Sequence, residues 1–291
     1  MLNFRLSGNC HVLNCKSTYF CRMIKIILGF LVVLITIISC NNQSHNEEST
    51  KTAAQQPSGR EKILLDSISA FPDSLLLREE LIQYYRENAD YTKAITAADE
   101  AIQKDSLNDR LWQIKGDLYF ENYDTINAIT ALNRAADLNP LPKYIITLGS
   151  LYAQTGDTVA LQVADFIVEA KMTETAKESF FIKGLYYNFT GDKNKAIGFF
   201  DKCLGLDYNY MYAYREKAIA LYDIGKYEDA IAVLDKAVTV QPKFDEGYYW
   251  LGRCLEKQDK TKDAIEEYKN ALRISPDYVE AKDALTRLGV K

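Results

Sequence analysis

The sequence predicts an all-α fold, a solenoid of antiparallel helix hairpins in which each hairpin stacks on the next. Two observations support this prediction. A pattern of small and large residues recurs every 34 residues, and the 291-residue chain holds only six prolines beside 20 tyrosines and 12 phenylalanines. Periods of this length are characteristic of repeat architectures, whose units bury their apolar faces by stacking on neighbours.

The repeat is clearest near the C-terminus, where residues 245–278 align with residues 211–244 without a gap. Small residues and prolines coincide in the two copies: Ala264 with Ala230, Ala271 with Ala237, and Pro276 with Pro242. The last copy carries its fixed positions at Leu251, Gly252, Leu255, Ala264, Tyr268, Ala271 and Pro276.

This spacing resembles the signature of the tetratricopeptide repeat (TPR) family, in which each repeat is one helix–turn–helix unit. The resemblance implies a curved right-handed superhelix with a concave surface lined by the first helix of each hairpin. It covers residues 60–288, divided into a half repeat, six repeats and a C-terminal capping helix: 60–74, 75–108, 109–141, 142–176, 177–210, 211–244, 245–278 and 279–288. The third repeat is one residue longer than the 34-residue period and has no clear second half.

Small residues at fixed positions explain why the hairpins can pack closely. Glycine or alanine at the eighth position lets the two helices of a hairpin approach, and large residues fill the remaining space. Gly156 and Gly191 suit the left-handed cap of a first helix, and the aspartate after each suits the start of the second.

The N-terminal 39 residues form a predicted signal peptide region. Its apolar run, Ile26–Ile38, has 13 residues, too few to span a bilayer and appropriate for a signal peptide core. Because Met23 begins a complete signal of this kind, we expect translation to start there. The residues Ile37-Ile38-Ser39-Cys40 resemble a bacterial lipobox, which implies lipidation of Cys40 and a bacterial TPR lipoprotein. The alternative is an uncleaved membrane anchor.

Residues 40–59 are then a lipidated cysteine followed by a flexible polar linker. The resemblance to lipoproteins implies a place in the bacterial cell envelope, at the outer membrane or facing the periplasm. Asn41, directly after the cysteine, favours the outer membrane over the inner one.

The composition disfavours several function classes. Beyond residue 39, 31 lysines and arginines face 40 acids, a net charge of −9 that gives no general attraction to nucleic acid. The only histidines, His11 and His45, precede the repeats, so no histidine-dependent catalytic or zinc site is expected there. We therefore expect no enzyme, no metal and no cofactor, with Cys203 packed and inert.

The resemblance places a protein-binding surface on the concave side, at positions 2, 5, 9, 12 and 13 of the first helices. Aromatic residues and arginine are enriched in binding hot spots. The residues carried over as candidates are Phe181, Phe189, Tyr212, Arg215, Tyr222, Tyr249 and Arg253.

These features predict a membrane-tethered scaffold that docks a protein or peptide segment in its groove. One alternative is a lipoprotein that binds glycan or another nutrient through its aromatic residues beside a transporter. Another is self-association through apolar residues of the third repeat: Ile145, Ile146, Val159, Leu161 and Val163.

Overall fold

The computed structural model describes residues 59–174 and 176–290, and these residues form fourteen helices and no strand. The signal peptide region, Cys40 and the linker up to residue 58 lie outside the described residues. None of the described helices is long and apolar enough to cross a bilayer.

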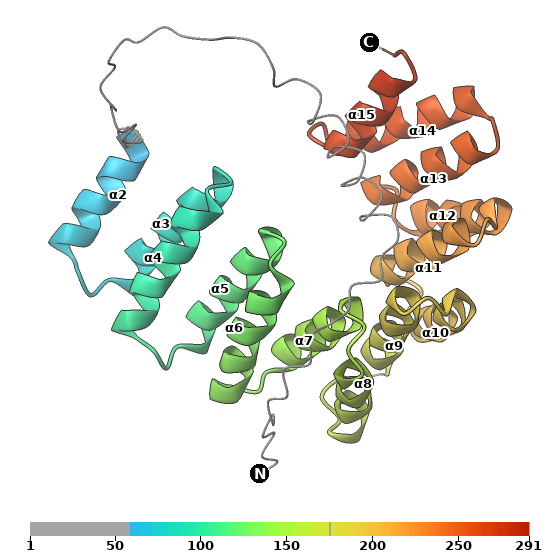
Figure 1. The fold of residues 1–291 in the computed structure, drawn as a ribbon. Helices are drawn as coiled ribbons and strands as arrows, with labels where there is room; N and C mark the ends of the chain where they lie inside the picture. The colour runs from blue at the N-terminus through green and yellow to red at the C-terminus, as the bar shows by residue number, and fades with distance from the viewer. Residues whose placement is uncertain (1–58, 175, 291) are drawn as a thin grey trace, which may run out of the picture. The chain divides into compact units, whose positions relative to one another are not determined.

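Twelve of the helices make six hairpins (Figure 1). The first helices are α3 (Leu75–Glu87), α5 (Asp109–Glu121), α7 (Pro142–Gln154), α9 (Lys177–Phe189), α11 (Met211–Asp223) and α13 (Asp245–Lys257). The second helices are α4 (Tyr91–Lys104), α6 (Thr125–Leu138), α8 (Val159–Glu169), α10 (Lys193–Leu206), α12 (Tyr227–Val240) and α14 (Thr261–Ile274). A single helix stands at either end, α2 (Gly59–Ala70) and α15 (Val279–Arg287).

The substantial contacts join helices that are adjacent or next-adjacent in sequence. The core is accordingly a series of local clusters, each shared by neighbouring hairpins. This organisation is that of a solenoid, and it confirms the predicted all-α fold class.

Small residues of the first helices lie directly against large residues of the second. A Cβ atom added to Gly184 would lie 2.5 Å from the ring of Phe200, and one added to Gly252 would lie 2.6 Å from Tyr268. Gly116 meets Leu132 in the same way, at 2.7 Å. A side chain at these glycines would therefore separate the two helices of the hairpin.

The turns inside the hairpins have one shared conformation. The fifteenth residue of every repeat has a positive φ angle, between 54° and 96°: Ala89, Tyr123, Gly156, Gly191, Gly225 and Asp259. The predicted left-handed caps at Gly156 and Gly191 are thus confirmed. An aspartate follows at the start of α10, where Asp192 accepts a hydrogen bond from the Lys195 amide at 3.1 Å.

The third hairpin departs from the pattern because its second helix is short. Helix α8 has 11 residues, whereas the corresponding helices have 14, and α7 packs directly against α9. Three apolar residues proposed for self-association, Ile145, Ile146 and Val163, pack against the core cluster around α9 and α10. That core covers much of the apolar face that self-association would need.

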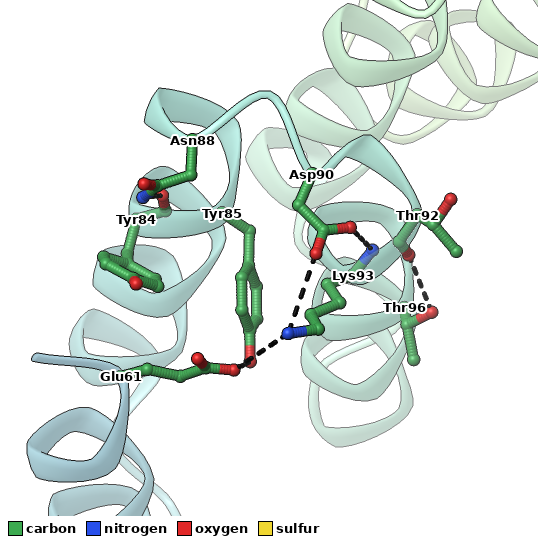
Figure 2. A network of polar contacts seen from close by, with 8 residues as sticks. All are labelled: Glu61, Tyr84, Tyr85, Asn88, Asp90, Thr92, Lys93 and Thr96. Carbon is green, nitrogen blue, oxygen red and sulfur yellow. Dashed lines mark hydrogen bonds and ion pairs between the residues drawn. The ribbon is translucent and has the colours of Figure 1, made fainter. Parts of the chain in front are cut away.

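The N-terminal helix α2 is held by a buried carboxylate. Glu61 accepts hydrogen bonds from the Tyr85 hydroxyl at 2.9 Å and from Lys93 Nζ at 3.2 Å, so one side chain joins α2 to both helices of the first hairpin (Figure 2). Burial, reinforced by Glu61, raises the pKa of Tyr85 to about 12.

The C-terminal helix α15 is tied down in a similar way. Arg287 donates to both carboxylate oxygens of Glu256 on α13, at 2.7 and 2.8 Å, and Tyr268 on α14 donates to the same carboxylate. The hydrogen bonds from Arg287 are the main cause that lowers the pKa of Glu256, against the opposing effect of burial. Ala281, Ala284 and Leu285 cover the last core cluster.

Both cysteines of the repeat region are buried free thiols. Cys203 and Cys254 are 0% exposed, and burial raises the pKa of each to about 12. Their role is packing, as expected for Cys203, which takes the place of a small repeat residue.

The contact between Gly184 and Phe200 gives a testable coupling. Gly184→Ile should lower the free energy of unfolding by about 1–3 kcal/mol through overpacking, and Phe200→Ala should lower it by leaving a cavity. The double variant should lose less than the sum of the two, because the new side chain enters the space that the ring leaves. A double-mutant cycle by urea denaturation measures this coupling, and strict additivity would contradict the contact.

The ion pair between Arg287 and Glu256 predicts that the stability of the protein depends on pH. A carboxyl whose pKa is lowered on folding adds stability above its unfolded pKa, near 4.5, and loses it as the pH falls through the lower folded value. Glu256→Gln should therefore lower the melting temperature at pH 6, with the difference from the parent shrinking towards pH 3. Glu266→Gln, which removes an exposed partner of Arg273, is the control, and an equal effect at both sites would refute the prediction.

Candidate functional site

Charged residues on the first helices pair with one another across neighbouring hairpins. Arg110 contacts Glu79 at 2.8 Å, and Arg215 contacts Glu246 at 2.7 Å. In both pairs position 5 of one repeat meets position 2 of the next, 31 residues later. Side chains expected to face a partner therefore neutralise each other within the protein.

Arg215 shows this most clearly. Its guanidinium donates to both oxygens of Glu246 and to Glu216 at 3.1 Å. Burial raises the pKa of Glu216, while Arg215 acts in the opposite direction. Two carboxylates thus compensate Arg215, which makes it a structural residue more than a ligand-binding one.

Two of the candidate aromatic residues are buried. Phe181 is 7% exposed, and its ring centroid lies 6.0 Å from that of Phe200 and 5.2 Å from that of Tyr210. Tyr249 is 9% exposed and packs against Tyr268 and the neighbouring rings. The expectation that Phe181 offers its ring to a partner is corrected: large residues at this position fill the space between hairpins.

Two others are exposed, Phe189 at 53% and Tyr212 at 58%. The Arg215 guanidinium lies over the Tyr212 ring, 5.4 Å from its centroid. Neither aromatic residue lines the pocket described next, so the candidates do not form one continuous aromatic surface.

A pocket of about 570 Å³ lies on the first-helix face near the C-terminal end. It is lined by residues of α11, α13 and α15: Tyr222, Tyr249, Arg253, Glu256, Lys257, Glu280, Asp283, Ala284 and Arg287. The sequence analysis named three of these residues, Tyr222, Tyr249 and Arg253, and the structure brings them together here. The volume is within the usual range of ligand-binding pockets.

Arg253 is held in this pocket by aromatic residues. It donates to the Tyr249 hydroxyl oxygen at 2.9 Å and to that of Tyr222 at 3.3 Å. Its guanidinium carbon lies 5.4, 5.8 and 5.3 Å from the ring centroids of Tyr222, Tyr249 and Trp250. Such cation–π contacts fix the position of the charge without neutralising it.

The wall contributed by α15 was missed by the sequence analysis, which treated this helix only as a cap of the array. Glu280, Asp283 and Arg287 occupy the second, fifth and ninth positions of α15, three of the positions that the family resemblance places on the concave side of a first helix. Helix α15 takes the place of a first helix, so the same positional rule applied to it identifies all three residues.

Comparisons with known proteins agree with this architecture. A tetratricopeptide repeat model matches residues 80–141 and 215–279, and a second one matches residues 177–210. The TPR repeat-containing protein MJ1428 of Methanocaldococcus jannaschii is 28% identical over 66% of this chain and 36% of its own length. The STIP1 homolog of Dictyostelium discoideum is 29% identical over 32% of this chain and 17% of its own length. The chain thus spans well under half of these relatives.

Two solved structures show the same fold. A tetratricopeptide repeat protein from Parabacteroides merdae superposes with a TM-score of 0.64 and 19% identity, over 79% of this chain and 91% of that one. PilW, a type IV pilus biogenesis factor, superposes with a TM-score of 0.52 and 15% identity, over 72% of this chain and 98% of its own. The repeat pattern, the helix arrangement and the matching family models lead to one conclusion: the chain belongs to the tetratricopeptide repeat family.

Proposed function

We propose that this protein is a membrane-tethered adaptor that docks a peptide segment of another protein at the C-terminal end of its repeat array. Tetratricopeptide repeats indicate a scaffold for protein–protein interaction. The pocket between α11, α13 and α15 is the observation that carries the more specific proposal, because it gathers exposed charge and aromatic edges in one recess.

The surroundings of the pocket favour a polar peptide over a neutral sugar. Glycan stacking requires open aromatic faces, whereas Tyr249 is 9% exposed and Arg253 lies over the Tyr222 ring. The walls carry cations from α13 and acids from α15, which complement the charged side chains of a protein partner.

The tether rests on the sequence alone. Cys40 follows a signal-type apolar run, and acylation there would hold the repeats at a face of the bacterial envelope through a polar leash. The proposed location is the outer membrane. Placed there, the adaptor would present its pocket to proteins of the envelope.

The docking surface is tested by site-specific photocrosslinking in cells. A photoreactive amino acid at Lys257, which lines the pocket, should give a discrete crosslinked product with a partner. The same amino acid at Lys269, an exposed residue of the second helix α14, should not. Equal products from the two positions, or none from Lys257, would argue against docking in the pocket.

The tether is tested by metabolic labelling with an alkyne-bearing fatty acid. Cys40→Ser should abolish the label and release the protein from the membrane fraction, because the acylated atom is lost. Cys254→Ser, which replaces a buried thiol of the repeats, is the matched control and should keep both properties. Label retained in the Cys40 variant would disprove the anchor.

A further inference from the structure

The charges in the pocket fall into two classes, paired and unpaired. Arg287 and Glu256 neutralise each other through two hydrogen bonds. Arg253 has no carboxylate within 4.0 Å among the described residues, and it donates hydrogen bonds to two tyrosine hydroxyls. It differs in this from Arg215 and Arg287, each of which is bound by a carboxylate.

The opposite wall has the complementary property. Glu280 and Asp283 of α15 line the pocket, and neither forms an ion pair with a lysine or arginine of the described part of the chain. Lys257 on α13 likewise has no acidic partner there. Cations on one helix and acids on another therefore share one recess without neutralising each other.

This arrangement is suited to a ligand that carries both charges. The guanidinium of Arg253 has five N–H groups in a planar fork, and the tyrosines occupy only part of them. The rings hold the fork in place, so a carboxylate gains charge-assisted hydrogen bonds at a reduced cost in side-chain entropy. A cationic group on the same ligand would reach the acids of α15.

We infer that the pocket recognises a peptide segment in which an acidic residue stands beside a basic one. The carboxylate binds Arg253 and Lys257, and the basic side chain binds Glu280 and Asp283. This inference rests on the proposed docking function and adds the chemistry of the partner. A purely acidic segment would meet repulsion from α15, and a purely basic one would meet repulsion from α13.

The test is a selection from a random peptide library displayed on phage, with the full-length protein in detergent as bait. The parent protein should select peptides enriched in adjacent acidic and basic residues. Arg253→Gln should lose the acidic preference, and Asp283→Asn should weaken the basic preference. Arg273→Gln, which removes an exposed arginine on α14, is the matched control and should select as the parent does.

A selected peptide then serves as the probe in a binding cycle. Replacing its acidic residue by glutamine should weaken binding to the parent by about tenfold or more, and should change binding to Arg253→Gln by less than about twofold. Circular dichroism checks that the variants fold. Asp283 is exposed, so its replacement tests the second wall without disturbing the core.

The outcomes separate the two proposals. Peptides that bind Arg253→Gln and Asp283→Asn as tightly as the parent would overturn the charge-pair inference and leave peptide docking intact. If the parent selects no peptide at all, and Lys257 gives no crosslink in cells, the docking function itself fails.

Discussion

The close approach of two helices inside each hairpin is the constraint on which the rest of the structure depends. It requires a small residue on one helix wherever the other carries a large one. In the fourth and sixth repeats a glycine of the first helix accepts an aromatic ring of the second, Phe200 or Tyr268. In the first repeat the sizes are exchanged, with Ile82 on the first helix and Ala98 on the second, both buried in one cluster. The combined volume of the two facing side chains is what matters. Either helix of the hairpin can carry the larger one.

This constraint explains why the fold could be predicted from the sequence. Small and large residues that recur every 34 residues can be recognised in the sequence. The glycines of the left-handed turns, Gly156 and Gly191, can be recognised as well. The short helix α8 is equally visible, as a third repeat without a clear second half. Each of these features depends on local sequence and on the next hairpin alone.

The candidate site could be predicted only in part, because exposure depends on neighbours in the adjacent repeat. Position 5 carries Phe181 in one hairpin and Arg215 in the next; the first is buried between hairpins and the second is bound by Glu246. Whether a residue on this face is available to a ligand is decided by the residue about 31 positions away. Because Glu246 can be read from the sequence, a comparison of adjacent repeats could have predicted its pairing with Arg215. The burial of Phe181 could be learned only from the structure, since an aromatic ring at that position can either pack between hairpins or face solvent.

The pocket also limits how this array could change its number of repeats. Its walls come from α11, α13 and α15, and the last of these is a single helix that follows the sixth hairpin. An extra hairpin inserted between α14 and α15 would replace the acidic wall by another first helix and dismantle the recess. A duplication among the earlier hairpins would leave it whole. For as long as the recess is in use, gene duplication can therefore add hairpins before α11 but not between α14 and α15.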